Sequence, residues 1–153
     1  MKTKKIAVEM LAVAFACGAV VLLTGPSLAQ KPFAERIRKV YGLDKEKNGN
    51  CHMCHQYDKE KGESPEKDNL NAFGKELKAV PSMKPLLGKD DDYKFTPADL
   101  DIVEAAFKTI LDKDTDGDGA TNGEEVALGT FPADPKSTPD KAALEKYRAE
   151  HKK

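Results

Sequence analysis

The fold of this chain depends most on Cys51-His52-Met53-Cys54-His55, which has the pattern C-x-x-C-H. The 153 residues contain one other cysteine, Cys17, near the N-terminus. A cysteine pair this close in sequence forms a disulfide, binds a metal ion or carries a covalent cofactor. Each of these outcomes would give the chain a different core.

The spacing of this motif predicts covalent attachment of one haem c. Two thiols three positions apart on a helical turn can each add to one vinyl group of the porphyrin, so Cys51 and Cys54 bind it. The next residue, His55, then directs its imidazole to the iron as the proximal ligand. A haem also gives a small domain without Trp a large apolar plate around which to pack.

A thioredoxin-like redox pair and a zinc site are the alternatives for this segment. The redox pair requires a βαβ context, and no alternation of apolar and polar residues predicts strands here. Zinc requires a fourth ligand, because the two cysteines and one histidine supply three. His52 and His55 are too close in sequence to complete a tetrahedron, and His151 lies in a charged tail. The sequence therefore favours haem over a disulfide or zinc.

The distal ligand of the iron is left open by the sequence. Met83 follows His55 by 28 positions, in a segment that Pro81 and Pro85 constrain. Such a methionine is either a thioether ligand of the iron or a core filler, which is the usual role of methionine. His151 and a distal side with no protein ligand are the other possibilities.

Apolar residues recur at helical spacing along the rest of the chain and predict an all-α domain. The expected helices are one from Pro32 to a stop at Gly42, one around Leu70–Pro81, one capped by Thr96 with an apolar stripe up to Leu111, a short one at Glu124–Leu128, and a charged one from Thr138. The stripe of the first helix consists of Phe33, Ile37, Val40 and Tyr41. We expect these stripes to form the core.

The segment 114–125 matches the twelve-residue pattern of an EF-hand-like calcium loop. Alternate residues of such a loop converge their oxygens on one cation, and a glycine at position 6, here Gly119, permits the sharp turn. Starting the loop at Asp112 would put Gly123 at position 12, where a bidentate carboxylate is needed. The predicted Ca²⁺ ligands are Asp114, Asp116, Asp118, Ala120 through its carbonyl, Asn122 and Glu125. The alternative is a solvated acidic turn.

The first 29 residues predict a cleaved secretory signal. A basic start precedes an apolar run from Met10 to Leu23, and small residues precede a cleavage site after Ala29. The run of 14 residues is shorter than the ~20 that a spanning helix needs. An uncleaved anchor and a lipoprotein acylated at Cys17 are the alternatives. Cleavage would leave one haem-binding domain, residues 30–153, in the periplasm or otherwise exported.

The charge of the expected mature chain excludes two classes of partner. The signal takes three lysines and one glutamate from the 25 basic and 26 acidic residues, which leaves 22 and 25 and a net charge of −3. So mild a balance argues against nucleic acid and against a membrane surface as partners.

The motif, the amphipathic helix before it and the later methionine together resemble a small monohaem cytochrome c. The resemblance implies a mostly helical fold and electron exchange between the haem edge and a redox protein that the sequence does not identify. Residues 112–135, with their G-T-x-P-x-D-P tail, resemble a bacterial thrombospondin type 3 or EF-hand-like calcium loop. A looser likeness is to small exported bacterial proteins that combine C-x-x-C-H, an N-x-F-G segment (here 71–74) and such a loop.

Electron transfer without an enzymatic reaction, beside a structural calcium ion, is the function that we expect. A haem enzyme or gas sensor would need an open distal site, and the sequence shows no recognisable arrangement of a distal base and a cation. A calcium-dependent binding module in which haem is structural is the third possibility.

Overall fold

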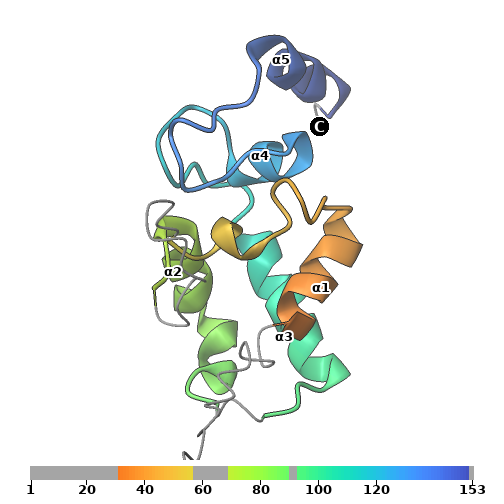
Figure 1. Cartoon of the computed structure of the whole chain (residues 1–153), viewed down its shortest axis with the longest axis vertical. Coiled ribbons are helices and arrows are strands. Elements are labelled where there is room, and N and C mark those ends of the chain that lie inside the picture. The colour runs from red at the N-terminus through yellow and green to blue at the C-terminus, as the bar shows by residue number, and fades with distance from the viewer. Residues whose placement is uncertain (1–30, 57–68, 90–92, 152–153) are drawn as a thin grey trace, which may run out of the picture.

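The computed structural model describes residues 31–56, 69–89 and 93–151, and these residues form a small all-α domain without strands. The predicted signal, residues 1–29, lies outside the described part. The elements in chain order are α1 (Lys31–Tyr41), the 3₁₀ turn η2 (Cys51–Met53), α2 (Ala72–Ala79), the 3₁₀ segment η3 (Pro81–Leu86), α3 (Pro97–Thr109), α4 (Asn122–Leu128) and α5 (Lys141–Glu150) (Figure 1). The predicted fold class, all-α, is confirmed.

The ends of the helices follow from local capping chemistry. The Thr96 hydroxyl accepts from the Asp99 amide at the start of α3, and the Asp99 carboxylate accepts from the Thr96 amide, which completes the predicted cap. Gly129, with φ of 86°, ends α4. The last helix begins later than predicted, at Lys141, because Asp140 and not Thr138 caps it by accepting from the Ala143 amide.

The core lies where α1, α3, η2 and η3 meet. Helices α1 and α3 lie side by side (Figure 1), and the Arg36 guanidinium joins them by pairing with Asp101 and Glu104. The Phe107 ring lies 4.9 Å from Tyr41 and 5.5 Å from Phe73, centroid to centroid. The buried cluster comprises Ile37, Met53, Phe73, Met83, Leu86, Val103, Ala106, Phe107, Ile110 and Val126.

Several members of the predicted apolar stripes differ from expectation, and the stripe of the last predicted helix contributes no buried residue. Val40 is 43% exposed, so only part of the first predicted stripe is core. Leu70 precedes α2 instead of belonging to it, since it forms an isolated antiparallel bridge with His55. Pairing with the cysteine motif therefore takes Leu70 out of the helix.

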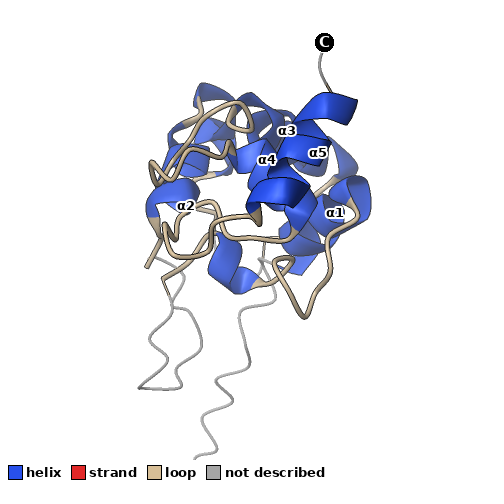
Figure 2. Ribbon diagram, turned by 90° about the horizontal axis from the view of Figure 1, so that it is seen from above, coloured by secondary structure: helices blue, strands red, loops and turns tan. Residues whose placement is uncertain are grey.

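The C-terminal helices form one end of the molecule. Helix α5 lies beside α4 in both views (Figures 1 and 2) and has no buried residue. Arg148 attaches it by donating to the Glu124 carboxylate and to the Gly119 carbonyl. No helix in the described part of the chain is both long and apolar enough to cross a membrane.

Candidate functional site

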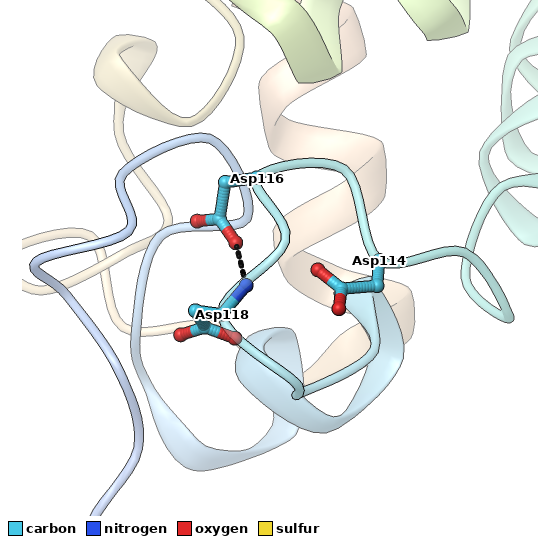
Figure 3. A group of neighbouring side chains, drawn as sticks. All are labelled: Asp114, Asp116 and Asp118. Carbon is cyan, nitrogen blue, oxygen red and sulfur yellow. Dashed lines mark hydrogen bonds between the residues drawn. The ribbon is translucent and has the colours of Figure 1, made fainter.

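Three aspartates of the 114–125 loop converge on one point (Figure 3). One carboxylate oxygen each from Asp114, Asp116 and Asp118 lies within 4.8 Å of the other two. The Asp114 carboxylate accepts from the amides of Gly117, at 2.7 Å, and Gly119, at 3.0 Å. These bonds curl the loop so that alternate side chains point inward. The register predicted from the sequence brings these three carboxylates together.

Gly119 supplies the turn that this convergence requires. Its φ of 94° lies in the region that L side chains rarely adopt, and Gly117 has a φ of 79°. The two glycines therefore let the chain reverse direction between Asp116 and Ala120. Of these two, the sequence pattern identified only Gly119.

Glu125 shows most directly that the loop fits a cation. The residue is completely buried, and neither of its carboxylate oxygens has a hydrogen-bond partner among the described residues. Burial, together with the negative charges of Asp116, Asp118 and Asp114, raises the pKa of Glu125 to about 8. Burial also raises the pKa of Asp116. A buried carboxyl without partners is costly, and a cation would supply what its oxygens lack.

The donor set also indicates which cation would fit. The three aspartates and Glu125 offer only hard carboxylate oxygens, which suit Ca²⁺ and its six to eight oxygen ligands. Asn122 is buried, but its amide spans the loop, donating to the Ile110 carbonyl at 2.7 Å and accepting from the Thr115 amide at 3.2 Å. The ligand roles of Asn122 and of the Ala120 carbonyl stay predictions.

The cysteine motif forms a turn that polar side chains hold at its start. The Asn50 side chain accepts from the His52 amide and donates to the Lys47 carbonyl, which caps η2. The His55 amide donates to the Cys51 carbonyl at 3.0 Å and closes one helical turn. Cys51 is exposed, Cys54 is half-buried, and they are not joined in a disulfide.

The segment 71–74 holds the other side of this turn. The Asn71 side chain donates to the carbonyls of His52 and Met53, each at 3.0 Å, and accepts from the Gly74 amide at the start of α2. The Asn71 backbone amide donates to the Cys54 carbonyl at 3.0 Å. The Gln56 amide donates to the Asn69 carbonyl at 2.9 Å, so the chain on both sides of His55 is paired.

Gly74 lets α2 pack directly on the motif. A Cβ at this position would overlap the Cys54 carbonyl oxygen and lie 2.9 Å from its carbon. The sequence pattern indicated only that a glycine weakens this helix. The positioning roles of Asn50, Asn71 and Gly74 escaped prediction, although the N-x-F-G segment was the visible signal for two of them.

A cavity of about 260 Å³ joins the predicted haem ligands. Cys51, Cys54, His55 and Met83 all line it, although Met83 comes from η3, a separate element. Its remaining lining is mostly apolar and comes from α1, α2, η3 and α3 and from loop residues such as Leu70, with Phe33, Ile37, Leu77, Leu86, Val103 and Phe107 among the helical members. Two thiols, an imidazole and a thioether in one apolar cavity form a donor set that fits a covalent haem. His151 does not line the cavity.

The protonation of Cys54 bears on the alternative chemistry of the pair. Burial, with a smaller contribution from the neighbouring Cys51, raises the pKa of the Cys54 thiol to about 12. Thiol–disulfide exchange requires a thiolate, which catalytic C-x-x-C pairs obtain by lowering the pKa of one cysteine. The surroundings of Cys54 therefore act against this cysteine as the attacking thiolate of such a pair.

Comparison with known proteins identifies the calcium loop and leaves the cysteine motif without a match. The family model described as a bacterial TSP3 repeat matches residues 114–135. No cytochrome family model matches. No curated protein and no solved structure matches the chain. The repeat and the aspartate cluster are together consistent with calcium binding.

Proposed function

We propose that this chain is an exported monohaem c-type cytochrome that transfers electrons and carries a structural calcium ion. The observation that carries the proposal is the cavity, because Cys51, Cys54, His55 and Met83 line it together. When bound, haem supplies one-electron chemistry by alternating between ferrous and ferric iron. Electron transfer to and from a redox protein, with no enzymatic reaction, is the function that needs only this site.

Each ligand residue has a defined task in this proposal. Cys51 and Cys54 hold the cofactor through thioethers, and His55 is the proximal ligand. The paired backbone on both sides of His55 limits movement of its imidazole. Met83, which is 5% exposed, is the distal ligand, and the apolar walls keep water away from the metal.

The calcium ion has a structural task in the same proposal. Extracellular calcium modules bind weakly and stay occupied where calcium is abundant, which agrees with a periplasmic or otherwise exported location. Binding to the native loop alone would stabilise the fold by mass action. The buried, unpartnered Glu125 supports this role, since the cation would complete the loop that connects α3 to α4.

Visible spectra test the electron-transfer assignment. We expect the ferrous protein to bind carbon monoxide slowly or not at all, because Met83 occupies the distal side. The Met83→Ala protein should lose the ferric sulfur-to-iron band and bind carbon monoxide. Met53→Ala is the matched control, because Met53 also lines the cavity and is 4% exposed but lies within the motif. Retention of the band in Met83→Ala would exclude Met83 as ligand, and rapid binding by the parent would favour a gas sensor or haem enzyme.

A calcium-dependent binding module is the second candidate, because the bacterial TSP3 repeat is the part of the chain that a family model matches. In that case a bound haem would be only a structural part of the hydrophobic core. Electrochemistry separates the two candidates. A reversible ferric/ferrous wave with rapid electron exchange would support the first, and slow electron exchange or the absence of a haem wave would support the second.

A further inference from the structure

We infer that calcium in the 114–125 loop controls the position and rigidity of the Cys51–His55 turn, through helix α2 and through Asn48. The inference rests on the proposed function, since it assigns a regulation to the same haem site. Its physical basis is a continuous set of contacts that runs from the acidic loop to the motif. Neither of the two connecting routes includes a predicted calcium ligand.

The first route leads from the loop to α2. The Thr115 hydroxyl, at the second position of the loop, donates to the Glu76 carboxylate at 3.1 Å. Lys113, just before the loop, pairs with the same carboxylate at 3.5 Å. Glu76 lies in the middle of α2, so the loop determines where one side of this helix sits.

Helix α2 then acts on the motif through its first turn. Asn71 caps the helix and donates to the His52 and Met53 carbonyls, and Gly74 lies against the Cys54 carbonyl. The helix has only eight residues, so a shift at Glu76 moves both ends together. Displacement of α2 would therefore disturb the carbonyls of His52, Met53 and Cys54.

The second route bypasses α2. The buried Asn48 side chain donates to the Val126 carbonyl at 3.0 Å, immediately after Glu125 in α4. Asn48 stands three residues before Cys51, in the segment that leads into η2. Movement of α4 on loss of calcium would thus reach the motif from its N-terminal side.

Loss of the cation provides the driving force. Without calcium, the Glu125 carboxyl remains buried without a partner, close to three aspartates. Protonation of Glu125 removes its charge but leaves its oxygens without partners, and opening of the loop would expose them to water and break the Thr115–Glu76 and Asn48–Val126 contacts. A network with two arrangements, one of which calcium favours, is what couples two sites energetically.

Hydrogen–deuterium exchange on the secreted full chain, with calcium and with a chelator, tests this inference. We expect chelation to accelerate exchange both in the loop and in the peptide covering residues 50–56, which contains the His55 amide. Thr115→Val and Glu76→Ala each remove the hydrogen bond of the first route, and either of them combined with Asn48→Ala, which removes the second route, should reduce the chelator effect on residues 50–56 about fivefold while leaving it intact in the loop. Asn48→Ala should reduce it through the second route.

Thr138→Val is the matched control, because its hydroxyl donates only to the nearby Pro135 carbonyl and has no contact with α2. It should behave as the parent does. Acceleration confined to the loop, or full coupling in the variants that combine Asn48→Ala with Thr115→Val or with Glu76→Ala, would overturn the inference. Failure here is distinguishable from failure of the proposed function. A haem-bearing chain without coupling overturns only the inference, whereas a colourless chain that retains coupling overturns only the haem assignment.

Discussion

Gly74 lies against the Cys54 carbonyl so closely that no side chain fits between helix α2 and the cysteine motif. This contact explains why a glycine stands in the first turn of α2. It also joins the cysteine motif, which holds the only thiols among the described residues, to α2. Through Glu76, this helix contacts the acidic loop. These contacts lead to one prediction about Gly74 and one about the acidic loop.

Gly74→Ala should destabilise the protein by about 1–3 kcal/mol, because the new methyl group would overlap backbone that cannot rotate away. Urea denaturation measures the loss. Gly123→Ala is the control. Its Cβ would lie 3.1 Å from the Leu111 carbonyl oxygen, which is a less severe contact than at Gly74, so this substitution should cost less stability. If Gly74→Ala were as stable as the parent, or more stable, helix propensity and not packing would govern the site.

Glu125→Gln should weaken calcium binding by at least about tenfold, because it removes the charge from a buried carboxylate that closes the loop. Titration calorimetry measures the affinity. Glu124→Gln is the matched control, because the Glu124 carboxylate pairs with Arg148 and caps α4 instead of facing the aspartates. Equal losses in the two variants would contradict the loop register.

Calcium affinity should rise as the pH increases toward 8. Burial raises the pKa of Glu125 from its ordinary 4.5 to about 8, so the calcium-free protein holds a proton there that the unfolded chain has lost. Stability of the calcium-free protein should therefore fall as the pH rises from about 4.5 to about 8. Calcium binding near pH 6.5 should release a proton. Calorimetry in two buffers of different ionisation enthalpy counts it, and zero release would contradict the assignment.

Arg148→Met should loosen α5 with little effect on the rest of the domain. The Arg148 guanidinium donates to Glu124 and to the Gly119 carbonyl, and α5 has no buried residue to replace these contacts. Ion pairs at exposed positions contribute little to stability, so the unfolding free energy should fall only slightly. Thermolysin cleavage within α5 should become faster. Lys146→Met, which removes only a pair within the helix, should leave the cleavage rate unchanged.

Local patterns in the sequence were sufficient to predict the helices and the calcium loop. The Thr96 cap, the glycine that ends α4 and the converging aspartates each depend on residues a few positions apart. One departure was also local, because Asp140 and not Thr138 caps α5, and another arose where distant segments meet. Leu70 pairs with His55, and nothing near either residue in sequence indicates this pairing.

The candidate haem site shows the same division. The C-x-x-C-H motif predicted Cys51, Cys54 and His55 without reference to the fold, and Met83 lines the same cavity, as a distal ligand must. The polar contacts of Asn71 could not be predicted, because they join residues 18 and 19 positions apart. Such contacts become visible only when the packing of α2 is known.

The mass of the secreted polypeptide, produced in cells with a haem-attachment system, tests the haem assignment most directly. We expect a red protein whose mass exceeds that of the processed chain by one haem, with a pyridine haemochrome spectrum typical of two thioethers. The Cys51→Ser and Cys54→Ser double variant should be colourless and carry no added mass. A colourless parent with the mass of the bare processed chain would contradict the account and leave the calcium site as its surviving part.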